Sequence, residues 1–152
     1  MLERCKRVYI LGVDGIGNSP SMIDTPNFNR VVNLGASTLQ GQTAFPPISA
    51  ECWGTMLLGI EPSAHGLTND IVEDKTFYWP ETNSKSSSIF KLVHEKYPNA
   101  ELASFSSWEP INRGMMEASL PIHKESHPDL EITDYLLKYL EDHDPKLLFF
   151  RS

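Results

Sequence analysis

Residues 7–13 read Arg7-Val8-Tyr9-Ile10-Leu11-Gly12-Val13, a nearly continuous apolar run that is partly β-branched. Such a run is typical of a central strand that is covered on both faces. The strand is expected to end at Asp14, because residues 14–18 (Asp-Gly-Ile-Gly-Asn) have the composition of a turn. The first predicted element is therefore a buried strand with an acidic residue at its carboxyl end.

Helical and extended patterns alternate along the rest of the chain. Helices are predicted for 26–34, 49–58, 86–97 and 130–141, and strands for 37–43, 101–105, 118–122 and 146–152. Residues 62–70 are expected to form a loop that ends in a turn at Asn69-Asp70. This alternation predicts parallel β-α-β units, and hence an α/β fold with an open, mostly parallel sheet and helices on both faces. Ligands bind beyond the carboxyl ends of such strands, so Asp14 lies where a site is expected.

Length and composition fit a single α/β domain over residues 1–152. The 13 basic and 20 acidic residues give a net charge of -7 without a basic run, which argues against binding nucleic acid or an anionic membrane through bulk charge. Two cysteines, Cys5 and Cys52, favour a reducing compartment over a disulfide scaffold. Neither a signal-peptide pattern nor an apolar stretch of about 20 residues is present, so a soluble cytoplasmic protein is expected.

A single serine follows a stretch that two prolines stiffen, Phe45-Pro46-Pro47-Ile48-Ser49. Proline disfavours helix in the residue before it, so the chain should stay extended until about Ile48 and then run as a helix from Ser49 to Leu58. Ser49 would lie at the positive end of the helix macrodipole, where backbone N–H groups attract anions and favour a serine alkoxide. The segment therefore predicts a nucleophile that is presented to a phosphate group.

The order of four motifs resembles the alkaline phosphatase superfamily, most closely its type I phosphodiesterase and nucleotide pyrophosphatase branch. The motifs are the strand that leads to Asp14-Gly15, then Thr25-Pro26-Asn27-Phe28-Asn29-Arg30, then Phe45-Pro46-Pro47-Ile48-Ser49, and then Leu57-Leu58-Gly59-Ile60-Glu61-Pro62-Ser63-Ala64-His65-Gly66. The resemblance covers residues 8–70.

The resemblance implies a metal-dependent phosphoric ester hydrolase that acts on a small-molecule phosphate ester. It implies two divalent metal ions, zinc first, with manganese or magnesium as alternatives. By position, Asp14 becomes a metal ligand, and Ser49 becomes both the nucleophile and a ligand of the second ion.

The chain departs from the family pattern at two places. The phosphodiesterase branch has asparagine three residues after the nucleophile, at a position that contacts the substrate, and this chain has Cys52 there. The family also takes its other metal ligands from a C-terminal half that begins just after a strand like Leu147–Phe150. We therefore expect an N-terminal fragment of a larger catalytic domain that is inactive alone, with the C-terminal half or an oligomer partner covering the sheet edge.

Other assignments stay open at this level. Trp108 is a candidate for the leaving-group pocket, with packing in the core as the alternative. A non-catalytic α/β domain that binds an anion at the Ser49 helix is a second interpretation. A nucleotide-binding domain is a third, although the turn from Gly12 to Gly17 lacks the third glycine of G-x-G-x-x-G. The histidines after His65 show no metal-ligand spacing and are expected on the surface.

Overall fold

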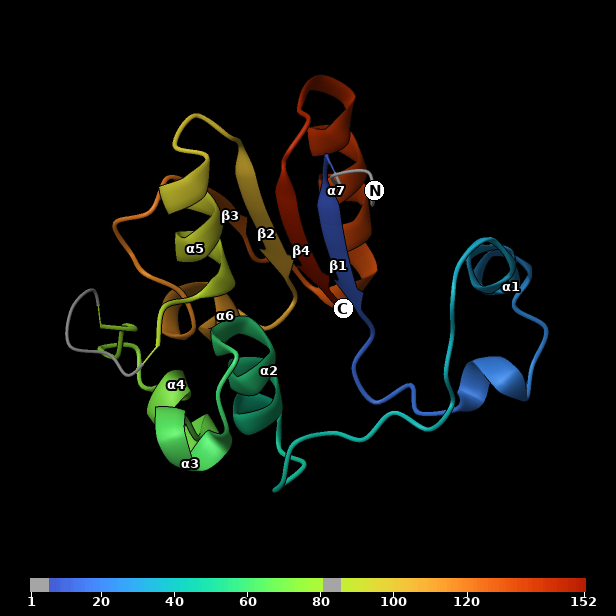
Figure 1. Cartoon of the computed structure of the whole chain (residues 1–152), viewed down its shortest axis with the longest axis horizontal. Coiled ribbons are helices and arrows are strands. Elements are labelled where there is room, and N and C mark those ends of the chain that lie inside the picture. Colours follow the sequence, from blue (N-terminus) through green and yellow to red (C-terminus); the bar gives the residue numbers. More distant parts are fainter. Residues whose placement is uncertain (1–5, 81–85) are drawn as a thin grey trace.

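One parallel sheet organises the computed structural model, which describes residues 6–80 and 86–152. Within those residues its strands are β1 (Val8–Gly12), β2 (Leu102–Ser106), β3 (Ile122–Glu125) and β4 (Leu147–Arg151). Their order is β1-β4-β2-β3, and every pair is parallel (Figure 1). The last strand in sequence therefore lies between the first and second, as an open α/β fold allows.

Helices cover both faces of this sheet. Side chains of β2 and β4 alternate between the faces because successive residues of a strand point to opposite sides. Leu102, Leu147 and Phe149 pack with α2 (Ser49–Leu58), α5 (Ile89–Lys96) and α6 (Pro110–Gly114). Phe105 and Phe150 pack on the other face, against α7 (Asp129–Asp142). The predicted fold class is confirmed, including both helical layers.

Three predicted segments differ from the structure. Residues 37–43 form no strand and are exposed, so the prediction for this segment was wrong. Residues 62–70 were expected as a loop, but they contain α3 (Pro62–His65) and the start of α4 (Asn69–Glu73), where Thr68 accepts a hydrogen bond from Ile71 N–H. The strand predicted near 118–122 begins only at Ile122, because Pro121 has no N–H to donate to a ladder.

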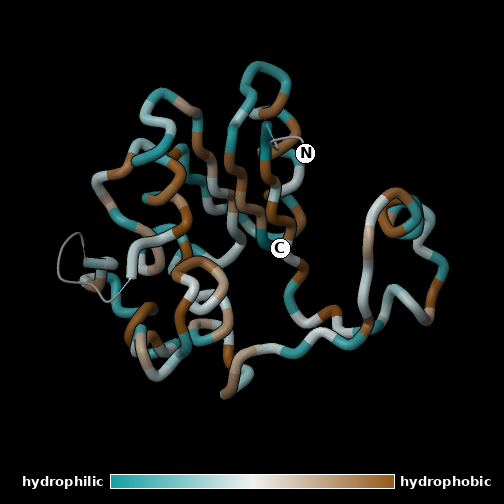
Figure 2. Tube along the Cα trace, in the orientation of Figure 1, coloured by the Kyte–Doolittle hydropathy of each residue, from teal (hydrophilic) through white to brown (hydrophobic). Residues whose placement is uncertain are grey.

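Residues 13–48 leave the sheet as a long arm (Figure 1). The arm contains a short 3-10 helix (Ser19–Ser21) and α1 (Pro26–Leu34), which Gly35 ends as predicted. None of the residues of α1 is buried, although its apolar positions are plain in Figure 2. The prediction of α1 was correct, but the helix has no packing partner in the described chain.

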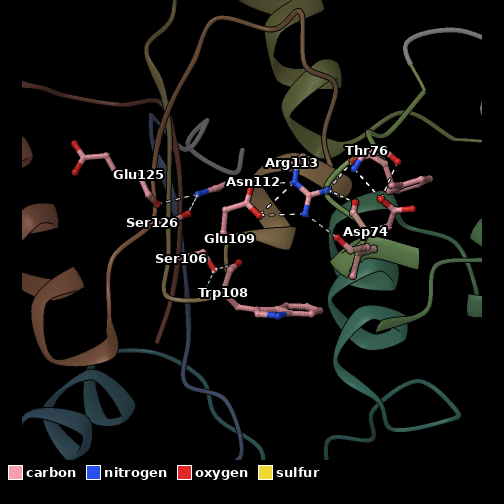
Figure 3. Close-up of polar contacts among 11 residues, drawn as sticks. Asp74, Thr76, Ser106, Trp108, Glu109, Asn112, Arg113, Glu125 and Ser126 are labelled. Atoms are coloured by element: carbon pink, nitrogen blue, oxygen red, sulfur yellow. Dashed lines mark hydrogen bonds and ion pairs between the residues drawn. The ribbon is translucent and has the colours of Figure 1, made fainter. Parts of the chain in front are cut away.

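Arg113 in α6 ties the β2 side of the domain to residues 72–77. Its guanidinium donates to the carbonyl oxygens of Asp74, Phe77 and Val72 at 2.6, 2.8 and 3.0 Å, and to Glu109 (Figure 3). Arginine suits this role because its planar fork offers five N–H donors.

Among the described residues, no helix is both long enough and apolar enough to cross a membrane.

Candidate functional site

The first turn of α2 places Ser49 as the sequence predicted. Ile48 is extended, with φ -112° and ψ 150°, and the helix begins at Ser49. Cys52 N–H donates to the Ile48 carbonyl as the first bond of the helix, and Gly59 ends the helix in a left-handed conformation. The hydroxyl of Ser49 thus lies at the helix N-terminus, where the helix dipole favours negative charge.

Asn69 reaches the same helix N-terminus from α4. Its side-chain Oδ1 accepts a hydrogen bond from Ala50 N–H at 3.0 Å. Sequence reasoning missed this contact, since Asn69-Asp70 was interpreted as a turn, and an asparagine 19 residues away gives no local capping signal. The contact fixes α4 against the residue that follows Ser49.

Asp14 lies beyond the carboxyl end of β1 and is bound by Arg151 at the end of β4. Arg151 Nη2 donates to Asp14 Oδ2 at 2.6 Å, while Arg151 Nη1 donates to Ser107 Oγ at 2.7 Å. The hydrogen bond from Arg151 is the main cause that holds the pKa of Asp14 below its ordinary value. The Trp53 side chain and Gly15 N–H act in the same direction, and burial acts against them. Asp14 is therefore a carboxylate at neutral pH.

One cavity brings these groups together. It has a volume of about 500 Å³, and Asp14, Ser49 and Cys52 all contribute to its wall. The remaining wall is mixed: Val13, Ile16, Pro47, Ile48, Trp53 and Met56 are apolar, and Gln42, Thr43 and Thr55 are polar. Among the described residues that line it there is no lysine or arginine. The cavity lies beside the carboxyl ends of β1 and β4, where parallel sheets bind ligands.

Cys52 and Trp108 have different surroundings. The Cys52 sulfur lies 2.9 Å from Thr43 Oγ1 on the cavity wall, so the residue is in place to touch a bound molecule. Trp108 follows β2 and packs, partly buried, against the core that contains α2 and α5 (Figure 3). It is not among the residues that line the cavity of Ser49.

The described residues do not complete a metal centre. Nowhere in residues 6–80 and 86–152 do three or more His, Cys, Asp or Glu side chains form a group that could hold a metal ion. Zinc takes about four ligands, and the Asp14 carboxylate already has Arg151 as its partner. Asp14 and Ser49 alone therefore do not fit a two-ion site.

His65 holds the segment after α2 against the helix. Leu67 N–H donates to its Nδ1 at 3.0 Å, so the proton is on Nε2, which lies 3.2 Å from the Glu51 carbonyl oxygen and 3.3 Å from Thr55 Oγ1. Burial is the main cause that lowers the pKa of His65. Because Thr55 also lines the cavity, His65 supports its wall from behind.

Two other histidines flank one carboxylate far along the chain. On β3, His123 Nε2 lies 2.6 Å from Glu125 Oε1. After the strand, His127 Nε2 lies 2.9 Å from Glu125 Oε2. The His127 ring stacks on Tyr135 of α7, with centroids 3.5 Å apart. These contacts attach the end of β3 to α7.

No protein-family model matches this chain, and no curated protein or solved structure matches it. The likeness to the alkaline phosphatase superfamily therefore stays a prediction from the motifs.

Proposed function

We propose that this protein is a phosphoric ester hydrolase of the phosphodiesterase or nucleotide pyrophosphatase type, with Ser49 as its nucleophile. The observation that supports the proposal is the shared cavity, in which the hydroxyl at the N-terminus of α2 and the Asp14 carboxylate line the same wall. The substrate is a small-molecule phosphate ester.

We place the protein in the cytoplasm, since its two cysteines suit a reducing compartment.

The helix N-terminus accounts for the first part of the reaction. A phosphoryl group beside Ser49 would accept hydrogen bonds from first-turn N–H groups of α2 other than Ala50 N–H, which donates to Asn69. Those donors and the positive end of the helix dipole would stabilise its equatorial oxygens. Ser49 Oγ then attacks phosphorus in line and forms a phosphoserine, its proton passes to solvent, and the ester oxygen leaves with the electron pair of the broken P–O bond and takes a proton from water. A water molecule then hydrolyses the phosphoserine, which releases the phosphate product and restores the hydroxyl of Ser49. The apolar part of the cavity wall and Cys52 contact the organic part of the ester.

The metal ions belong to the proposal as well. Two divalent ions, zinc first, with manganese or magnesium as alternatives, would take Asp14 and Ser49 among their ligands. The described residues provide too few donors, so we assign the other ligands to a C-terminal half of the domain or to an oligomer partner at the sheet edge.

A thermal-shift experiment with inorganic phosphate and zinc chloride tests the proposal on the 152-residue chain. Zinc and phosphate together should raise Tm more than the sum of their separate effects, because a phosphate group beside Ser49 would add oxygen ligands for one zinc ion to the two that Asp14 and Ser49 provide. A ligand at 100 times its Kd stabilises by about 2.7 kcal/mol, or roughly 5–10 °C for a domain of this size. Ser49→Ala and Asp14→Asn should each abolish the joint effect.

Matched substitutions provide the control for this experiment. Ser63→Ala in α3 and Asp70→Asn in α4 change exposed residues of the same types and should keep the joint effect. If phosphate or sulfate alone protects the chain and zinc adds nothing, the protein is instead a non-catalytic anion-binding domain. A joint effect that survives in Ser49→Ala would remove Ser49 from the proposal.

A further inference from the structure

The outer edge of β1 is open. β1 is the first strand in the sheet order and pairs only with β4, so one row of its peptide groups has no ladder partner in the described chain. Val8, Tyr9 and Leu11 are 46%, 39% and 65% exposed, and Val13 just after the strand is 52% exposed. Exposed apolar edge strands pair readily with other chains.

The arm presents a second apolar face close to the first in sequence. Phe28, Val31 and Leu34 recur every third residue along α1, and they are 48%, 71% and 80% exposed. In Figure 1 the helix stands apart from the sheet, on the side where β1 is the outermost strand. We call the outer edge of β1 with Leu11 and Val13, and the side of α1 with Phe28, Val31 and Leu34, the β1–α1 surface.

The total exposed area is large for a folded chain of this mass. The accessible surface is 10181 Å² for 17.1 kDa, roughly 2,400 Å² more than the ~7,800 Å² that size scaling gives for a compact monomer. A stable complex buries about 800 Å² on each partner, and obligate dimers bury more. The excess over the whole chain is larger than the area that a stable dimer buries on each partner.

Charge permits a second copy of this chain as the occupant. Like charges repel, so two chains of net charge -7 must meet through a surface with little charge. Residues 13–48 include only Asp14, Asp24 and Arg30 as charged residues, so the arm is close to neutral. The surface also offers both halves of a self-complementary contact, an open strand edge and an apolar helix.

We propose that the β1–α1 surface binds a second copy of this chain. The two copies are related by a two-fold axis, their β1 edges pair antiparallel, and α1 of each copy covers the apolar side of β1 in the other. This inference does not require the proposed hydrolase function, because the β1–α1 surface leaves out Ser49 and shares only Val13 with the wall of its cavity.

Light scattering after size exclusion, over a wide range of protein concentration, tests the proposal. The wild-type chain should have a mass near twice 17.1 kDa. The double variant Val31→Glu, Leu34→Glu should raise the dimer dissociation constant roughly a hundredfold or more, since each interface would bury unpaired carboxylates. None of the residues of α1 is buried, so the variant should keep its fold, which circular dichroism checks.

A second variant and a control complete the experiment. Leu11→Lys places a charge on the exposed edge of β1 and should also give the monomer. Leu92→Glu changes a leucine of α5 that is 57% exposed and is not part of the β1–α1 surface, and it should leave the dimer intact. A wild-type monomer at every concentration would overturn the proposal, and so would a dimer that persists in both interface variants. A monomer whose α1 amides resist hydrogen exchange would show that α1 docks on its own sheet instead.

Discussion

At the scale of single residues, the hydrogen bonds of His65 determine its charge. Leu67 N–H occupies Nδ1, so an added proton would have to displace that donor. Burial lowers the pKa of the imidazole, and the nearby Glu51 carbonyl only partly opposes this effect. His65 is therefore neutral in the folded chain, and its neutrality keeps Nδ1 available as the acceptor for Leu67 N–H.

A pH titration of stability tests this role. The unfolded chain has an ordinary histidine pKa of about 6.5, and the folded pKa is lower, so the unfolded state binds more protons between the two values. The free energy of unfolding should therefore fall as pH drops below about 6.5, by at most about 1.4 kcal/mol per pH unit. Urea denaturation at a series of pH values from about 8 to about 5, the interval in which histidine titrates, measures how the free energy of unfolding changes with pH.

His65→Gln provides the comparison for that titration. The variant lacks the titrating ring, so its stability should depend less on pH over the same interval, although it is lower overall. Equal slopes in the variant and the wild type would contradict the assignment of a neutral, half-buried His65.

At the scale of elements, β1 and α2 meet through a glycine and a tryptophan. A Cβ added at Gly12 would lie 2.4 Å from Trp53 Cη2 and 2.9 Å from Trp53 Cζ3. The ring cannot move away easily, because it is buried and packs edge-to-face on Phe149 with centroids 5.8 Å apart. This close approach positions α2, and with it Ser49, beside the end of β1 and Asp14.

Gly12→Ala should therefore destabilise the chain by about 1–3 kcal/mol, the usual cost of overpacking a core. Gly41→Ala is the matched control, because nothing lies within 4 Å of its added Cβ and its φ is not in the left-handed region. Chemical denaturation measures both variants. A Gly12→Ala protein as stable as the wild type would show that the Trp53 ring can shift.

The whole molecule determines whether the site can turn over a substrate. Asp14 and Ser49 share a cavity, but the described residues hold no group of three metal-ligating side chains. Because zinc takes about four ligands, the 152-residue chain should not hydrolyse phosphate esters by a two-ion mechanism.

Release of p-nitrophenolate from p-nitrophenyl phosphate and from its bis-ester, with zinc, manganese or magnesium added, checks this prediction. We expect no rate above that of the buffer and metal alone. Hydrolysis that a chelator removes, and that Ser49→Ala lacks, would show that the chain already holds a complete metal site.

Local sequence patterns were sufficient to predict those helices and strands whose own residues mark their bounds, through proline, glycine or the spacing of apolar residues. Ser49–Leu58 is a helix with the predicted bounds, because prolines hold the chain extended before it and Gly59 ends it in a left-handed turn. Asp129–Asp142 follows from its apolar spacing, and β4 from its apolar run. Residues 37–43 have strand-like composition, but no strand partner meets them, and a strand forms only where a ladder is available.

The amino-acid order was enough to predict the α/β class, the bounds of α2, and the candidacy of Ser49 and Asp14, because those features depend on neighbours within a few residues. Folding in three dimensions decided the rest. It placed β4 next to β1, brought Arg151 onto Asp14 and Asn69 onto the first turn of α2, and left α1 exposed. Such contacts join residues that are up to 137 positions apart, and strand order and long-range side-chain pairing leave no local pattern in a sequence.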